Sequence, residues 1–379
     1  MVITDMKVFM VDGSYQGTIG RSFVIVTLET DEGITGIGEG TTWPGGEIVK
    51  SALEYLKSYL VGKDPFRIEE LWSDLYNRMN HSGMTGFFVC ALSGIEMAMW
   101  DIVGKTLNTP VYNLLGGRCR DRIPVYANYW YKDIPDEEEA YQEKALEVKE
   151  AGYNMLKMCP FFGYQRGMPL TTPEMKKALS LVEAVRDAVG PDFGIAIECA
   201  ALFDSNTAAK GVELLGQYDP VWLEEPVPPE NVDVMARLRA QLQVPIASGE
   251  RLYTRHGFRE LIEKQAVNFI QPDVARTGGI LETKKIASMA EIHYVPVTPH
   301  NPNGPVCTAA TLQVAATLPN LYNVEFLYLD EPWRDAIISP PITVKNGYIE
   351  LSDLPGLGIE FNEKEAMAHP AIETLPLKA

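Results

Sequence analysis

The chain has 379 residues, more than one ordinary hydrophobic core accommodates, so its length favours a large barrel or two domains. Its apolar fraction of 46% and charged fraction of 22% are those of a globular protein, and no apolar run in the sequence predicts a membrane span. The formal net charge of −18 disfavours nucleic acid and anionic membrane surfaces as partners.

Residues 1–122 are predicted to form an α+β module. Two β-rich runs, 2–11 and 22–28, are followed by a turn at 30–33 and a third strand that ends at Gly40. Apolar residues then recur at helical spacing in three segments, 47–60, 66–79 and 86–105. The last of these has small residues along one face, which is typical of a tightly packed buried helix.

From Ile123 the pattern changes to short strands that alternate with helix-length segments such as 136–151, 173–189 and 304–317. Eight strands separated by helical crossovers predict a parallel (β/α) barrel over residues 123–332. The tail, 333–379, is predicted to complete the barrel and to pack on the N-terminal module. The predicted strands are 125–131, 155–159, 194–200, 221–225, 244–250, 269–274, 294–300 and 323–327.

Three consecutive predicted strands end on an acid, and these acids are Glu198, Glu224 and Glu250, each 26 residues from the next. Because strand residues alternate faces, only one of Glu224 and Glu225 can point the same way as Trp222. A carboxylate at the end of a buried strand is costly unless it is paired or holds a metal. Each acid could instead cap the following helix, but three at matched depth indicate a site for a hard divalent cation.

Four other polar residues fall at predicted strand ends: Lys157, Asp273, His300 and Glu325. Asp273 and His300 lie on adjacent strands, and an acid beside a histidine orients the ring and raises its basicity, as a general base requires. Lys157 is either a solvated lysine or a cation that stabilises negative charge on the substrate.

Alternation of side chains along a strand also predicts where the neighbouring small residues point. It places Cys159 on the face of Lys157, and Ala200 on the face of Glu198, with Cys199 directed outward towards the helices. Cys159 would then line the barrel mouth, although no basic partner that would activate its thiol is identifiable.

These residues give the chain a strong resemblance to the mandelate racemase subgroup of the enolase superfamily, over nearly its whole length. The matching features are Leu114 to Gly117 (LLGG), the acids in Glu-Glu-Pro and Gly-Glu-Arg, Gln271-Pro-Asp followed by Gly278-Gly-Ile, His300, and the tail from Pro355 (PGLGIEF). The resemblance implies a (β/α)7β-type TIM barrel, with a capping domain formed by the N-terminal α+β module and the C-terminal tail. Within the subgroup the chain resembles sugar-acid dehydratases of the gluconate and galactonate type.

The resemblance also implies roles for the strand-end residues. Mg²⁺ would be bound by Glu198, Glu224 and Glu250, and the Asp273–His300 pair would act as the base. Glu325 would hydrogen-bond the substrate carboxylate or enolate. In two places the chain departs from its relatives: many members carry a second lysine where Cys159 stands, and galactonate-type enzymes carry a histidine acid where Ala200 stands. A base opposite His300 is therefore missing.

We expect Mg²⁺-dependent dehydration of a polyhydroxy acid to a 2-keto-3-deoxy acid, by His300-mediated α-proton abstraction and a metal-stabilised enediolate. The alternatives are an epimerase, racemase or lactonising enzyme of the same superfamily, and a non-catalytic relative that binds a metal and an acid. The sequence does not identify the sugar acid. Specificity is expected from two capping loops, 13–20 and 41–46, and from Trp43, Asn128, Tyr131, Cys159 and Arg251.

The sequence also predicts the compartment and the partners. The N-terminus lacks the basic and apolar blocks of a signal peptide. The five cysteines are scattered, odd in number and without CxxC spacing, which favours reduced thiols in the cytoplasm. A small-molecule carboxylate is the expected partner, and the family resemblance implies a homo-oligomer.

Overall fold

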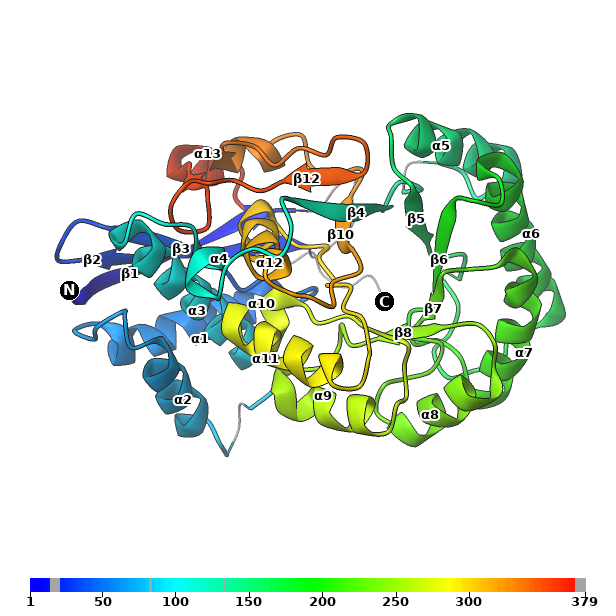
Figure 1. Cartoon of the computed structure of the whole chain (residues 1–379), viewed down its shortest axis with the longest axis horizontal. Coiled ribbons are helices and arrows are strands. Elements are labelled where there is room, and N and C mark those ends of the chain that lie inside the picture. Colours follow the sequence, from blue (N-terminus) through cyan, green and yellow to red (C-terminus); the bar gives the residue numbers. More distant parts are fainter. Residues whose placement is uncertain (14–20, 82–83, 133, 162, 372–379) are drawn as a thin grey trace.

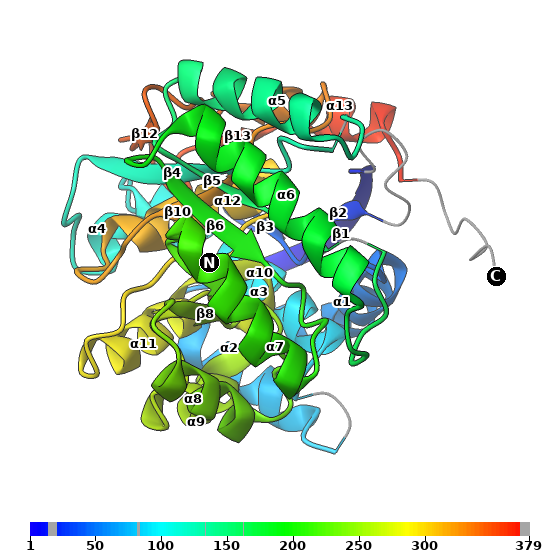
Figure 2. The same ribbon diagram turned by 90° about the vertical axis from the view of Figure 1, so that its right-hand side faces the viewer.

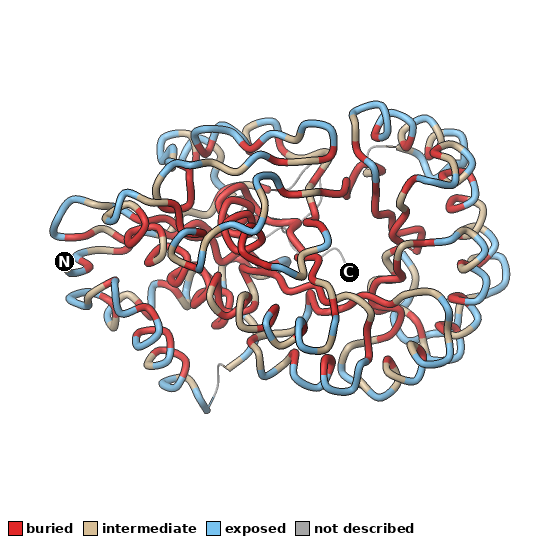
Figure 3. The backbone as a smooth tube through the Cα atoms, in the orientation of Figure 1, coloured by how far each residue is buried: buried red, intermediate tan, exposed pale blue. Residues whose placement is uncertain are grey.

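The computed structural model has an N-terminal α+β region packed beside a ring of alternating strands and helices (Figure 1). It describes residues 1–13, 21–81, 84–132, 134–161 and 163–371. The buried backbone is concentrated in the barrel strands and at the junction of the two regions, whereas the outer faces of the barrel helices are exposed (Figure 3).

The N-terminal region is a three-stranded antiparallel sheet covered by helices. The strands are β1 (Ile3–Asp12), β2 (Ser22–Thr30) and β3 (Thr35–Glu39), and the helices are α1 (Gly46–Leu60), α2 (Ile68–Arg78), α3 (Phe87–Thr106) and α4 (Val111–Leu114). Strand β3 lies directly against α3, because a Cβ atom at Gly38 would fall 1.9 Å from the carbonyl oxygen of Gly94. Helix α3 is long and apolar enough to cross a membrane, but 89% of its most apolar window is buried, as in a core helix.

The barrel contains seven parallel strands in the order β10-β4-β5-β6-β7-β8-β9. Its helices lie outside the strands, as the turned view shows for α5 and α6 (Figure 2). The strands are β4 (Arg122–Asn128), β5 (Met155–Met158), β6 (Gly194–Glu198), β7 (Trp222–Glu224), β8 (Ile246–Ser248), β9 (Phe269–Ile270) and β10 (Val324–Leu327). The helices are α5 (Glu138–Glu150), α6 (Thr172–Val189), α7 (Ser205–Leu215), α8 (Val232–Gln241), α9 (Thr254–Glu263), α10 (Val274–Thr277), α11 (Ile280–Glu291) and α12 (Pro305–Ala316), with a 3₁₀ turn at Gly216–Tyr218. This confirms the predicted fold class.

The prediction of a seventh strand over 294–300 was wrong in extent. Only Val297 pairs there, with Ile270 on one side and Leu321 on the other. Pro296 and Pro299 have no N–H to donate to a ladder, and Tyr294 takes a left-handed backbone with φ 58°. The barrel still closes, because the Tyr322 amide donates to Val297 and the Glu325 amide donates to the Pro299 carbonyl.

The tail returns to the N-terminal region. It contains a 3₁₀ turn at Arg334–Ile337, strands β11 (Ile338–Ser339), β12 (Tyr348–Glu350) and β13 (Glu360–Phe361), and α13 (Glu363–Ala368). Strand β12 pairs antiparallel with β4, and β11 pairs with β13. Past α13, Pro370 bridges to Val11, and the Ala371 amide donates to the Met10 carbonyl.

Three buried carboxylates of the N-terminal region accept hydrogen bonds from the later part of the chain. Glu39 accepts from the amides of Gly304 (2.7 Å) and Cys307 (2.8 Å), at the N-terminus of α12. Glu96 accepts from two backbone amides at the N-terminus of α11. Asp101 accepts from the Leu357 amide at 2.8 Å. A carboxylate at a helix N-terminus satisfies unpaired N–H groups and complements the helix dipole. The two regions are therefore joined by polar contacts as well as by apolar packing.

Candidate active site

Glu198, Glu224 and Glu250 converge at the ends of β6, β7 and β8. One carboxylate oxygen from each lies within 4.8 Å of the others, and Glu198 and Glu224 are register partners on adjacent strands. Glu224 shares a face with Trp222, whose indole N–H donates to it at 3.0 Å, as alternation predicted. Three clustered carboxylates offer the charged oxygen ligands that a hard divalent cation requires, so the residues present fit such an ion.

The electrostatics of the three acids are unequal. Burial, together with the charges of Glu224 and Glu250, raises the pKa of Glu198 well above its usual range. Burial also opposes ionisation of Glu224, but the neighbouring Lys157 outweighs it and lowers the Glu224 pKa. The cluster therefore carries a strong mutual repulsion, which a bound cation would relieve.

Lys157 is buried at the end of β5, in contact with three acids. Its Nζ lies 2.5 Å from Glu224 Oε1, 3.2 Å from Glu325 Oε1 and 3.7 Å from Glu198 Oε2. Burial disfavours the ammonium, but these carboxylates prevail and raise the Lys157 pKa well above its ordinary value. Lys157 is thus a fixed positive charge inside the mouth, not a solvated lysine.

His300 and Asp273 form a buried pair. His300 Nδ1 lies 2.8 Å from Asp273 Oδ2, so Nδ1 carries the proton in the neutral tautomer and Nε2 faces the mouth. Nε2 is 3.1 Å from Glu250 Oε2 and 4.0 Å from Glu325 Oε2. Burial lowers the His300 pKa, but Glu250, Glu325 and the hydrogen bond to Asp273 outweigh it and raise the pKa to about 10.

Glu325, at the second residue of β10, lies between Lys157 and His300. Its Oε2 accepts from the Asn301 amide at 2.9 Å, and its Oε1 receives the side-chain amide of Asn128. Asn128, a predicted substrate-binding residue, therefore lies in the mouth and fixes Glu325.

Arg251, also predicted to bind substrate, contacts two acids of the site. The Glu225 backbone is left-handed (φ 43°), and its carboxylate accepts from Arg251 Nε at 2.5 Å. Arg251 Nη2 lies 3.2 Å from Glu250 Oε1. Burial raises the pKa of Glu225 to about 8, against the opposing effect of Arg251. Arg251 thus links Glu225 to Glu250, one of the three clustered acids.

The other predicted substrate-binding residues lie farther out. Tyr131 and Cys159 line a hollow of 340 Å³, together with Lys132, Asp136, Tyr141, Pro160 and Tyr164. Trp43 is partly exposed on the loop after β3, with Lys132 Nζ 5.9 Å from its ring centroid. In the other capping loop, residues 14–20 lie outside the described residues.

Two residues just past β6 leave the strand conformation. Ala200 and Ala201 both have left-handed backbones, with φ 51° and 55°, so the alternation on which the prediction for Ala200 rested does not extend to them, and the face of Ala200 stays a prediction. Ala200 packs on the largest apolar cluster of the described residues, which also contains Cys159 and Cys199. Burial raises the pKa of Cys159 to about 12, which keeps it a thiol.

Two asparagines that support the His300 site were missed from the sequence. Asn303 Nδ2 donates to Asp273 Oδ1 at 2.9 Å, and Asn301 holds Glu325 through its backbone amide. Both follow His300 in the run His-Asn-Pro-Asn-Gly, so asparagines beside a strand-end histidine were the available signal.

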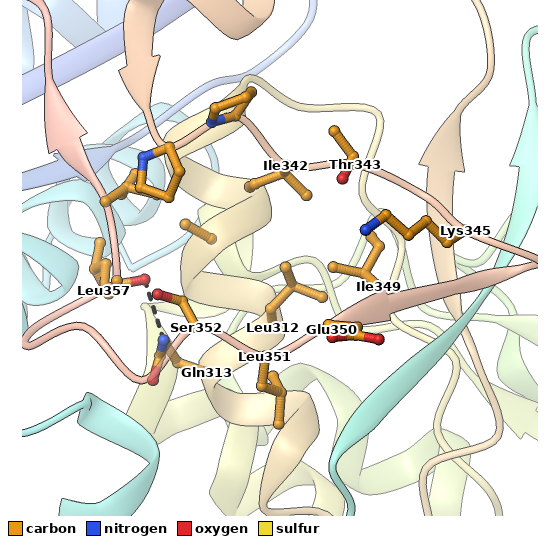
Figure 4. Close-up of a pocket in the computed structure, with 15 residues that line it drawn as sticks. Leu312, Gln313, Ile342, Thr343, Lys345, Ile349, Glu350, Leu351, Ser352 and Leu357 are labelled. Atoms are coloured by element: carbon orange, nitrogen blue, oxygen red, sulfur yellow. Dashed lines mark hydrogen bonds between the residues drawn. The ribbon is translucent and has the colours of Figure 1, made fainter.

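A second hollow, of 240 Å³, lies between α12 and the C-terminal tail (Figure 4). Its walls are mainly aliphatic, from Leu312, Ile342, Ile349 and Leu351, and Lys345 and Glu350 are the charged residues that line it. None of the strand-end acids lines this hollow, so it is separate from the candidate active site.

Comparison with known proteins agrees with this geometry. Residues 9–116 match the mandelate racemase / muconate lactonizing enzyme N-terminal domain, and residues 140–365 match the enolase C-terminal domain-like family. The chain belongs to the mandelate racemase / muconate lactonizing enzyme family. A mandelate racemase/muconate lactonizing enzyme from Sulfitobacter sp. has the same fold, with a TM-score of 0.91 and 31% identity over 98% of this chain and 96% of that one.

Family members of known activity are similar over most of their length. The chain is 36% identical to a D-xylonate dehydratase of Haloferax volcanii over 374 residues, covering 97% of this chain and 88% of that protein. It is 34% identical to a D-galactonate dehydratase of Ralstonia pickettii and to a D-galactarolactone cycloisomerase of Agrobacterium fabrum. Each match covers 90% of this chain and 89% of the relative.

Proposed function

We propose that the chain is a Mg²⁺-dependent hydro-lyase that converts a polyhydroxy (sugar) acid into a 2-keto-3-deoxy acid. The observation that carries this proposal is the convergence of His300 Nε2, the Lys157 ammonium and three carboxylates on one barrel mouth. The similarity to D-xylonate and D-galactonate dehydratases supports the choice of dehydration.

Glu198, Glu224 and Glu250 would hold the cation, whose chemistry there is to bind the substrate carboxylate and acidify the neighbouring α-proton. Lys157 lies among these acids, so it supplies a second positive charge beside the same carboxylate. Glu325 is fixed by Asn128, Asn301 and Lys157. In its protonated form, its hydroxyl would donate a hydrogen bond to the substrate carboxylate or the enediolate.

His300 takes the α-proton on Nε2, while Asp273 holds Nδ1–H and keeps its own charge. The electron pair of the C–H bond moves into the enediolate. That pair then forms the C2–C3 double bond as the β-hydroxyl leaves. In a syn elimination, His300 returns its proton to the departing oxygen, which leaves as water. The enol product tautomerises to the 2-keto-3-deoxy acid.

Only one face of the substrate has a base in this scheme. Just past β5 the chain has the buried thiol of Cys159, and Lys157 is held by carboxylates that keep it protonated. An epimerase would need a working base on each face of C2. The similarity to D-galactarolactone cycloisomerase keeps a lactone-forming or lactone-opening reaction as the second candidate. Retention of Asp273, His300 and Glu325 argues against a non-catalytic relative.

Screening acid sugars for a 2-keto product, with added Mg²⁺, tests the reaction. We then expect that only one C2 epimer of a responsive acid exchanges its α-proton in D₂O, and by family resemblance this should be the 2R epimer. NMR at C2 follows each epimer separately. Interconversion of both epimers at comparable rates would establish a second base and replace the dehydratase by an epimerase.

We further propose a cytoplasmic location, on the basis of five free cysteines. A small carboxylate remains the proposed partner, and assembly into a homo-oligomer stays a prediction from the family resemblance.

A further inference from the structure

The short helix α10 connects the catalytic pair to the N-terminal region. Asp273 is its N-cap, and Asp273 Oδ1 accepts from the Ala275 amide at 2.9 Å. The same residue holds His300 through its other oxygen. One turn later the chain passes through Gly278 and Gly279 into α11. We call the segment Gly278–Gly279 the α10–α11 elbow. Asp273 is separated from it by a single helical turn, so a displacement of the elbow would also move Asp273.

Side chains of the N-terminal region hydrogen-bond the elbow and the first residues of α11 at successive positions. Ser93 Oγ accepts from the Gly278 amide at 2.9 Å, and Trp72 Nε1 donates to the Gly278 carbonyl at 2.8 Å. Glu96 accepts from the amides of Ile280 (2.8 Å) and Leu281 (2.9 Å). Both carbonyl and amide groups of the elbow are thus fixed from outside the barrel.

Glu96 is the acidic residue among these contacts, and burial raises its pKa to about 7 although its hydrogen bonds oppose the shift. It is buried, and it also accepts from Trp100 Nε1 at 2.7 Å, so three N–H groups face its carboxylate. Two of them belong to the N-terminus of the twelve-residue α11, where a negative charge is favoured. A Cβ at Gly279 would lie 2.1 Å from Glu96 Oε2, and Gly279 has φ 101°, so the approach requires glycine there.

We propose that Glu96 is a positioning residue for proton abstraction: it anchors the α10–α11 elbow and thereby fixes Asp273 and the His300 ring. Its role in turnover rests on the proposed function of His300, but its effect on the geometry of the pair does not. The N-terminal region would then contribute to the reaction through the α10–α11 elbow.

The test compares two variants of α3. Glu96→Gln keeps the shape but places an amide N–H₂ against N–H donors, so kcat should fall about 10- to 100-fold with little change in KM. The kinetic isotope effect on a C2-deuterated substrate should rise, because proton abstraction becomes slower. The matched control is Asp101→Asn, since Asp101 is also a buried α3 carboxylate but its partners, the amides of Ile37 and Leu357 and the ammonium of Lys105, lie away from the elbow. Its folded fraction should retain the wild-type kcat and isotope effect.

An NMR readout separates this proposal from the proposed function. The Nδ1 proton of His300, identified by its loss in His300→Asn, should give a downfield resonance that shifts or broadens in Glu96→Gln and not in Asp101→Asn. If the wild-type protein shows no turnover but the His300 resonance still shifts in Glu96→Gln, only the proposed dehydratase function would be rejected. An unchanged resonance, or equal loss of kcat in both variants, would overturn the role of Glu96. Should Glu96→Gln not fold, Trp72→Phe removes one elbow hydrogen bond and should give the same shift, smaller in size.

Discussion

The acids of the barrel mouth and the acids of the domain junction are all shielded from solvent in large part, but they are surrounded differently. At the junction, Glu39 and Glu96 each face N–H donors at a helix N-terminus. At the mouth, Glu198, Glu224 and Glu250 face one another, and Lys157 neutralises only part of their charge. A buried carboxylate that accepts hydrogen bonds from N–H donors needs no further partner, whereas carboxylates that face each other require a cation. The partners, more than the burial, distinguish structure from function.

The largest expected effect comes from neutralising a mouth acid. Glu224→Gln removes a charged ligand and leaves Lys157 without its nearest partner, so turnover should fall on the order of 10³-fold or more. The fold should persist, because the strand and its neighbours are unchanged. Steady-state kinetics with circular dichroism as the folding control checks this. Full activity of the variant in EDTA-treated, Mg²⁺-free buffer would remove the metal site from the mechanism.

For an acid at the domain junction, we expect the substitution to reduce the stability of the fold. Glu39→Gln turns an amide N–H₂ towards backbone donors, which should reduce the free energy of unfolding by about 1–3 kcal/mol. Glu198→Gln, measured in the same Mg²⁺-free urea titration, should be neutral or stabilising, because it relieves repulsion from Glu224 and Glu250. Equal destabilisation by both variants would abolish the distinction between the two groups.

The smallest effect, taken per pH unit, is a pH dependence of Mg²⁺ binding. Without a cation, His300 has a pKa near 10, raised by Glu250 and Glu325 against burial, so it is protonated at neutral pH. Coordination of Glu250 removes a charge that raises this pKa, so binding should release a proton. Affinity should then increase with pH, by up to about tenfold per unit between pH 6 and 9. Calorimetry in buffers of different protonation enthalpy measures the release, which His300→Asn should diminish. A pH-independent affinity would show that His300 does not sense the cation.

The sequence predicted the mouth better than the junction, for a physical reason. Parallel strands of a barrel end at one level, so equal spacing along the chain brings Glu198, Glu224 and Glu250 together. The groups through which Glu39 and Glu96 hold the barrel helices are backbone amides more than 180 residues away, which leave no residue type to recognise. Within a strand, alternation placed Glu224 correctly. It does not extend to Ala200, because the left-handed residues just past Glu198 end the extended conformation. At the seventh strand, two prolines limited pairing to Val297.

The bridge between Val11 and Pro370 has a consequence for biosynthesis. Strand β1 leaves the ribosome well before Pro370 and Ala371, which it contacts and which are made about 360 residues later. At roughly 5–20 residues per second, β1 waits about 20–70 s for that contact. For the first part of this interval, until Ile280 and Gly304 are made, Glu96 and Glu39 have no helix N-terminus to accept from, and the apolar α3 has no barrel beside it. The N-terminal region is therefore made before the barrel but completed after it, and nascent chains should be most prone to aggregate before the barrel helices emerge.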